Sequence, residues 1–176
     1  RLERLIAELL DVARLTARRL ELEVEELDLA ELVRGVVAGM SEVASRTGSQ
    51  LHCEVPQSVI GSWDRFRIEQ VVGNLVTNAL KYGLGKPVIV RLRTEGEIAV
   101  LEVQDRGIGI DPAQHARIFE RFERAVSERH YGGLGLGLWI SRQIIDACAG
   151  TIEVESTPAV GSLFRVRLPS SSAGEP

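Results

Sequence analysis

The stretch that decides the fold is Asn74-Leu-Val-Thr-Asn78-Ala-Leu-Lys81-Tyr82, at the end of a helix predicted over residues 64–82. Asn74, Asn78 and Lys81 share one face of this helix, because they are four and three positions apart. Between residues 71 and 80 most other positions are Val, Leu or Ala, so the helix is predicted to be buried and its polar stripe needs partners. Amide oxygens suit a hard cation, and a lysine suits a phosphate. The alternative is a solvated helix face, although asparagine is a poor helix former.

A second motif combines a carboxylate with two glycines. Asp105 follows a strand predicted over residues 97–104, and Arg-Gly107-Ile-Gly109 turns away from it. A carboxylate that faces an apolar pocket can accept a hydrogen bond from the 6-amino group of adenine, and glycines let the backbone approach a base closely. The alternative is a simple Asp-Gly turn, which is common in proteins.

A third motif is the glycine-rich stretch Gly132-Gly133-Leu-Gly135-Leu136-Gly137, which precedes a helix predicted over residues 137–149. Such glycines leave backbone N–H groups free to face an anion at a helix start. A dinucleotide-binding loop requires a strand immediately before the glycines, but residues 123–132 form a polar loop. A protein-kinase glycine loop is excluded as well, because no Val-Ala-Ile-Lys or Asp-Phe-Gly follows.

Composition narrows the function further. The net charge is −4 without a block of lysine or arginine, which argues against nucleic-acid binding. No apolar run approaches the roughly 20 residues of a membrane helix, so no membrane contact is expected from this segment. Cys53 and Cys148 are far apart and are expected to be thiols in a reducing compartment, the cytoplasm. The chain opens at Arg1 in mid-pattern, which suggests a fragment of a protein that could be anchored in the inner membrane.

The chain is predicted to have three parts. Residues 1–19 form a helix with an apolar seam that needs a partner helix. Residues 20–168 form an α+β domain, and residues 169–176 form a disordered tail. The predicted strands cover residues 20–27, 51–55, 88–94, 97–104, 151–155 and 162–168, with helices from Asp28 to Val43, from Asp64 to Tyr82, from Asp111 and from Gly137.

The order and spacing of these motifs, with Phe119-Glu-Arg-Phe122 between the last two, resemble the ATP-binding catalytic domain of sensor histidine kinases. The resemblance covers residues 1–168 and implies a two-layer α/β sandwich with a mixed sheet, the Bergerat ATP-binding fold, that binds ATP and Mg²⁺. It also implies that residues 1–19 are the second helix of a dimerisation hairpin.

The resemblance implies a role for each motif. Asn78 is the main Mg²⁺ ligand and Asn74 a second contact, while Lys81 contacts phosphate and Tyr82 packs by the nucleotide. Asp105 binds adenine beside Gly107 and Gly109, with Ser162 as a water-mediated partner. The remaining nucleotide contacts are a lid, anchored by Phe119 and Phe122 and carrying Arg124 and Arg129, and the phosphate-binding residues Gly133, Gly135, Leu136 and Gly137.

One residue separates enzyme classes. Gyrase, mismatch-repair and heat-shock ATPases of the same superfamily carry a glutamate at the position of Asn74, and this glutamate activates water. Asn74 cannot act as a base, so the γ-phosphate is expected to go to another nucleophile. The alternatives are an ATP-binding module without turnover, a serine kinase of the anti-sigma-factor type and a dimerisation protein whose glycines only shape turns.

The acceptor is expected outside this chain. None of His52, His115 and His130 lies in the His-Glu-Leu-Arg-Thr-Pro context that carries the acceptor in the kinase family. The resemblance therefore implies that the intact protein is a homodimer that phosphorylates a histidine on its own dimerisation helices. An aspartate of a response regulator would be the next acceptor.

Overall fold

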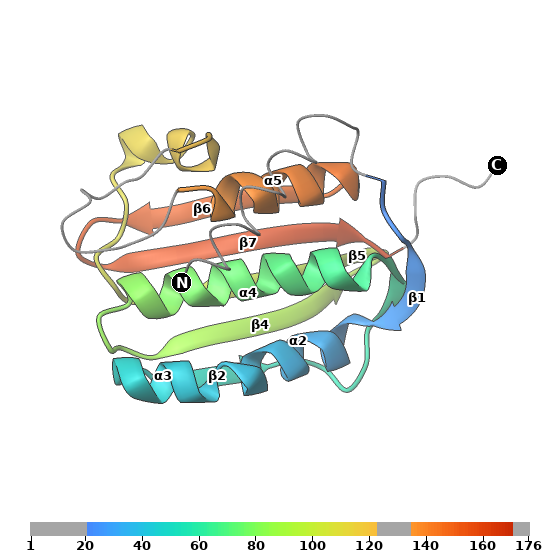
Figure 1. The fold of residues 1–176 in the computed structure, drawn as a ribbon, viewed down its shortest axis with the longest axis horizontal. Helices are drawn as coiled ribbons and strands as arrows, with labels where there is room; N and C mark the ends of the chain where they lie inside the picture. Colours follow the sequence, from blue (N-terminus) through green and yellow to red (C-terminus); the bar gives the residue numbers. More distant parts are fainter. Residues whose placement is uncertain (1–20, 123–134, 171–176) are drawn as a thin grey trace, which may run out of the picture.

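The computed structural model describes residues 21–122 and 135–170, in which a layer of helices covers one face of a five-stranded sheet (Figure 1). The strand order is β2-β4-β5-β7-β6, with β2 and β4 parallel and the other pairs antiparallel. This mixed sheet confirms the predicted α+β sandwich. The strands are β2 (Leu51–Glu54), β4 (Val88–Glu95), β5 (Ile98–Gln104), β6 (Thr151–Thr157) and β7 (Gly161–Pro169).

The helical layer is built around α4, which lies between α2 and α5 in Figure 1. The bounds are α2 (Leu29–Gly39), α3 (Ser41–Thr47), α4 (Arg65–Tyr82) and α5 (Gly137–Ala147), with short 3₁₀ helices at η1 (Pro112–Gln114) and η2 (Arg117–Phe119). The single helix predicted from Asp28 to Val43 is wrong. The backbone leaves the helical conformation at Met40, between Gly39 and Ser41, so the chain forms two helices.

A short ribbon of β1 (Glu25–Asp28) and β3 (Ile60–Trp63) closes one end of the molecule. The sequence predicted a strand over residues 20–27 and no strand at residues 60–63, so β1 starts later than expected and β3 was missed. Asp28 caps α2, because its Oδ1 accepts hydrogen bonds from the amides of Ala30 at 2.9 Å and Glu31 at 3.4 Å. The same oxygen accepts from the Val59 amide at 2.9 Å. Asp64 caps α4 by accepting from the Arg67 amide at 3.0 Å.

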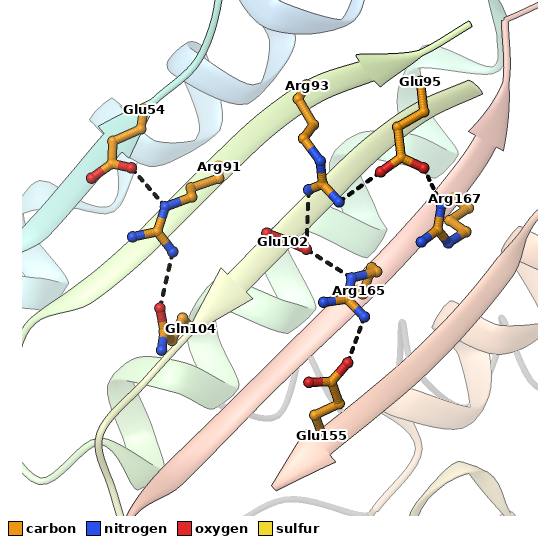
Figure 2. A network of polar contacts seen from close by, with 9 residues as sticks. All are labelled: Glu54, Arg91, Arg93, Glu95, Glu102, Gln104, Glu155, Arg165 and Arg167. Carbon is orange, nitrogen blue, oxygen red and sulfur yellow. Dashed lines mark hydrogen bonds and ion pairs between the residues drawn. The ribbon is translucent and has the colours of Figure 1, made fainter. Parts of the chain in front are cut away.

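The core lies between the sheet and the helices. Alternate residues of β4 are buried there, and α4 contributes its apolar face. The opposite face of the sheet carries arginine and glutamate side chains joined by ion pairs (Figure 2). Among the described residues, none of the helices combines the length and apolar character needed to cross a membrane.

Of the two predicted terminal segments, only the start of the C-terminal one can be compared with the structure. The predicted helix at residues 1–19 lies outside the described residues. The predicted tail begins too early, since β7 includes Pro169 and the Ser170 amide donates to the Glu97 carbonyl at 2.8 Å. Residues 171–176 lie outside the described part of the chain.

Candidate functional site

A polar row crosses the end of the sheet on the side that faces the helices. One step further in, Val103, Phe164 and Val154 lie opposite one another on β5, β7 and β6 and belong to the apolar layer. The next row is Asp105, Ser162 and Ser156. The Asp105 amide donates to the Ser162 carbonyl at 2.9 Å, and Ser162 lies opposite Ser156 in the β6–β7 register. The core therefore changes from apolar to polar in a single row.

Asp105 is the charged member of this row. The residue is only 5% exposed, and its Oδ1 accepts a hydrogen bond from the Gly107 amide at 2.7 Å. Burial raises the pKa of the carboxyl above its usual 3.8, against the opposing effect of backbone hydrogen bonds from Gly107 and Ser162. Within the described residues it forms no ion pair. A buried carboxylate without a cation is suited to accept a hydrogen bond from a ligand.

The glycines after Asp105 form a tightly held strap. A Cβ on Gly107 would lie 1.9 Å from the Tyr82 carbonyl oxygen, at the end of α4. Gly109 has φ 68°, and a Cβ there would lie 2.0 Å from the Thr157 carbonyl oxygen. The sequence predicted a close approach of these glycines to a base, and the close approaches in the structure are to neighbouring backbone on both sides, which fix the strap next to the polar row.

The polar stripe of α4 faces the start of α5. Asn74 Nδ2 donates to the Gly137 carbonyl at 3.2 Å and to Ser141 Oγ at 3.4 Å. Since a carbonyl can only accept, these contacts identify the amide nitrogen of Asn74 as the atom that bonds to the Gly137 carbonyl. Asn78 lies one turn later on α4 and is half-buried.

Lys81 and Tyr82 end this helix. Lys81 Nζ lies 2.9 Å from the Tyr82 hydroxyl and 4.6 Å from the centre of its ring. The sequence predicted both as ligand contacts. The structure pairs them with each other at the end of α4, beside the glycine strap.

The start of α5 has the features of an anion site. Gly135 has φ 72°, Leu136 is buried, and Gly137 is the first helical residue. Among the described residues, no side chain caps this helix start, so its first amides are available to an anion. The other predicted phosphate contacts, Arg124, Arg129 and Gly133, lie outside the described residues.

The two phenylalanines predicted to anchor the lid differ. Phe119 is buried and meets Phe164 edge-on, with ring centres 6.4 Å apart. Phe122 is 60% exposed with φ 61°, so it does not pack into the core. Its neighbour Arg121 instead covers the Trp139 ring of α5 at 4.3 Å. The sequence predicted both phenylalanines as anchors, but only Phe119 packs into the core.

Two serines complete the site without having been predicted. Ser141 is fully buried on α5 and accepts a hydrogen bond from Asn74, and Ser156 on β6 bonds to Ser162. Neither belongs to a motif that sequence could reveal, although Ser141 lies four residues after the first helical glycine, on the same face. Among the described residues, no cluster of three or more histidine, cysteine or acidic side chains could hold a metal ion.

Comparisons with known proteins agree with this geometry. The family model for histidine kinase-, DNA gyrase B-, and HSP90-like ATPases matches residues 63–172. The sensor histidine kinase MtrB of Mycolicibacterium paratuberculosis is 36% identical over 172 residues, covering 96% of this chain and 30% of MtrB. The sensor protein TorS of Escherichia coli is 42% identical over 131 residues, covering 74% of this chain and 14% of TorS. The chain thus spans less than a third of these relatives.

Solved structures give the same result. The full-length protein ShkA in complex with AMPPNP superposes with a TM-score of 0.85 at 29% identity, covering 99% of this chain and 37% of ShkA. The nucleotide-free catalytic domain of histidine kinase ThkA superposes with a TM-score of 0.77 at 27% identity, covering 86% of this chain and 98% of that domain.

Proposed function

Because this chain belongs to the family of histidine kinase-, DNA gyrase B-, and HSP90-like ATPases, it is an ATP-binding domain, and we propose how it holds and uses the nucleotide. The observation that carries the proposal is the buried Asp105 carboxylate, which lies beside a glycine strap and forms no ion pair within the described residues. Asp105 accepts a hydrogen bond from the 6-amino group of adenine. Ser162 assists through a water molecule, Gly109 borders the base, and Tyr82 packs by the nucleotide.

The triphosphate lies toward α4 and α5. Backbone amides at residues 135–137 and the positive end of the α5 dipole hold phosphate oxygens, and Lys81 supplies a cation from the end of α4. Arg124, Arg129 and Gly133 are further phosphate contacts in the part of the chain between the described segments.

The donor set of α4 fits Mg²⁺ bound together with the nucleotide. Asn78 and Asn74 offer neutral amide oxygens, and the hydrogen bonds of Asn74 to α5 hold its amide group in place. Two neutral oxygens do not hold Mg²⁺ tightly on their own, so phosphate oxygens and water supply the remaining ligands. When bound, the ion neutralises charge on the β- and γ-phosphates.

Asn74 also supports transfer of the phosphoryl group in preference to hydrolysis. Its amide is committed to Gly137 and Ser141 and cannot take a proton from water. A neutral imidazole nitrogen needs no base, because it attacks phosphorus with its own lone pair. We therefore propose that the chain works in the cytoplasm in a homodimeric sensor histidine kinase. It passes the γ-phosphate to a histidine on the dimerisation helices, and a response-regulator aspartate receives it next.

Titration with AMPPNP, with and without Mg²⁺, tests the site. Asn78→Ala should lower the affinity for Mg–AMPPNP about tenfold, since an oxygen ligand is lost, and leave the affinity for metal-free adenosine unchanged. Glu69→Ala, at an exposed position on the opposite side of the same helix, is the matched control. An equal loss with and without Mg²⁺ would remove Asn78 from the metal site. A parent chain that binds no AMPPNP would overturn the whole proposal.

The reaction is tested on the full-length gene product with labelled ATP. Acid-labile, base-stable phosphate should appear on a histidine of that protein, while the 176-residue chain alone should leave His52, His115 and His130 unlabelled. Acid-stable phosphate would instead indicate a serine kinase, and ATP binding without transfer would indicate a module that has lost turnover.

A further inference from the structure

We propose that Ser156 is a positioning residue: it fixes the proton of the Ser162 hydroxyl and makes the base pocket selective for a purine with a hydrogen-bond donor at position 6. This inference rests on the proposed adenine site at Asp105. Ser156 lies on β6, two strands away from Asp105, and belongs to none of the motifs that the sequence revealed.

The argument starts from three contacts at one oxygen. Ser156 Oγ lies 2.9 Å from the Ile110 amide nitrogen, 2.8 Å from the Gly161 carbonyl oxygen and 2.9 Å from Ser162 Oγ. A serine hydroxyl has one proton and two lone pairs. The Ile110 amide can only donate, so it occupies one lone pair. The Gly161 carbonyl can only accept, so it takes the proton.

Only one lone pair of Ser156 remains for Ser162. All three contacts are satisfied together only when the Ser162 hydroxyl donates its proton to Ser156. Because Ser162 is only 7% exposed, bulk water does not readily replace Ser156 as the acceptor of its hydroxyl proton. Ser156 Oγ therefore accepts the single hydroxyl proton of Ser162, so that Ser162 Oγ can only accept a hydrogen bond from a ligand.

The direction of this hydrogen bond affects the base pocket because of the position of Ser162. It stands between Ser156 and Asp105 in the polar row, and its carbonyl accepts the Asp105 amide. An ionised Asp105 is also an acceptor. Two neighbouring acceptors suit an amino group, or a water that donates to both, and they repel the oxygen of a 6-oxo purine. Sites built to hydrogen-bond one group reject analogues that lack it, because the buried partners stay unsatisfied.

The same bonds hold the strap in place. Ile110 is the residue after Gly109, and its only bond to β6 in the described residues is the one to Ser156 Oγ. Removal of this hydroxyl could therefore weaken nucleotide binding for a purely structural reason. The decisive quantity is the ratio of affinities for two nucleotides that differ only at position 6, because a loosened strap would weaken both equally.

Calorimetry should compare ATP with purine riboside triphosphate, which has hydrogen at position 6, in the parent chain and its variants. The parent should prefer ATP about tenfold or more, and Ser156→Ala should lower this ratio about three- to tenfold. Ser156→Thr restores the hydroxyl and should keep the ratio within about twofold of the parent. Thr157→Ala, at the next and exposed position of β6, is the matched control.

Each outcome decides one question. If Ser156→Ala weakens both nucleotides equally, Ser156 has only a structural role and the inference fails. If Ser156→Ala does not fold, Ser162→Ala takes its place, and an unchanged ratio there also overturns the inference. A parent that binds neither nucleotide, or binds both equally, counts against the adenine site at Asp105 itself.

Discussion

Two carboxylates, one on β5 and one directly after it, are both largely shielded from solvent and yet have opposite surroundings. Glu102 is 9% exposed and lies on the open face of the sheet, with Arg93 at 3.0 Å and Arg165 at 2.7 Å (Figure 2). Asp105 is 5% exposed, faces the helices, and forms no ion pair within the described residues. The two residues are three positions apart, so the alternation of the strand sends them to opposite faces.

Their pKa values move in opposite directions. Burial raises the pKa of Glu102, but hydrogen bonds from Arg165 and Arg93 outweigh this, and the result lies below the usual 4.5. Burial raises the pKa of Asp105 above 3.8, and backbone hydrogen bonds from Gly107 and Ser162 offset only part of the increase. The protein thus compensates one buried charge with arginines, whereas the other has no cation among the described residues and is the charge that we propose binds adenine. The first kind holds a structure together, and the second marks a binding site.

The compensation at Glu102 extends over the open face. Arg165 also pairs with Glu155 at 2.6 Å, and Glu95 accepts hydrogen bonds from Arg93 and Arg167 (Figure 2). Each exposed pair contributes little by itself, but the chain of pairs leaves no charge of the cluster without a partner. No comparable chain reaches Asp105 among the described residues.

Gly107→Ala should have the largest effect on stability and ATP affinity, because it changes the environment that keeps Asp105 in place. A Cβ would lie 1.9 Å from the Tyr82 carbonyl oxygen, and backbone cannot move aside as a side chain can. We expect a loss of about 2–3 kcal/mol in the free energy of unfolding and more than about 100-fold weaker ATP binding. Thermal denaturation and calorimetry measure the two effects.

Gly39→Ala is the control for this variant. Gly39 ends α2, and beyond its own helix and chain neighbours no atom lies within 4 Å of the place that an added methyl group would take. ATP affinity should therefore stay at the parental value, and stability should stay there or rise by up to about 1 kcal/mol, because alanine favours a helix more than glycine does. If Gly107→Ala bound ATP as tightly as Gly39→Ala, the strap would not form part of the nucleotide site.

Asp105→Asn tests the role of the charge at Asp105 alone, because it removes this charge with almost no change of side-chain shape. ATP affinity should fall roughly 10- to 100-fold, because a charged acceptor is lost and the amide presents a donor to the adenine amino group. The unliganded variant should nevertheless be more stable than the parent at neutral pH. In the parent, the pKa of Asp105 is raised in the folded state. The Asp105 contribution to stability is therefore full below pH 3.8 and is lost as pH rises through the folded-state pKa.

Denaturation across the pH range tests the sign. The stability advantage of Asp105→Asn over the parent should grow from acid to neutral pH. An advantage that shrank over this range, or a variant less stable than the parent at every pH, would show that the carboxylate is compensated after all.

Much of this arrangement follows from patterns along the chain. The spacing of Asn74 and Asn78 predicted a buried helix with a polar stripe, and the carboxylate and glycines at Asp105 predicted a strand end beside a tight turn. The turn that joins β4 and β5 lies at Gly96, which has φ 62°. These features depend on local periodicity or on the conformational freedom of glycine, both of which can be read from neighbouring residues.

The features that were missed depend on contacts between distant segments. β3 is a strand because it pairs with β1 and because Trp63 Nε1 donates to the Pro169 carbonyl at 2.9 Å. Ser156 matters only because the β6–β7 register places it opposite Ser162. Nothing in the spacing of a lone serine indicates its partner across a sheet, so the hydroxyl network could be found only in the folded chain.

Glu102→Gln should have the smallest effect and complete the comparison. It leaves Arg93 and Arg165 without their shared carboxylate, and we expect a loss of about 1–2 kcal/mol in the free energy of unfolding, with ATP affinity unchanged. Because the pKa of Glu102 is lowered, its contribution is present above pH 4.5 and is lost as pH falls through the folded-state value. The difference between parent and variant should therefore shrink on acidification, opposite to the behaviour of Asp105→Asn.

Glu153→Gln, an exposed position opposite Arg165 on β6, should change neither quantity. A Glu102→Gln variant that lost ATP affinity at full stability would mean that the open face also serves the nucleotide site, and the division between the two carboxylates would fail.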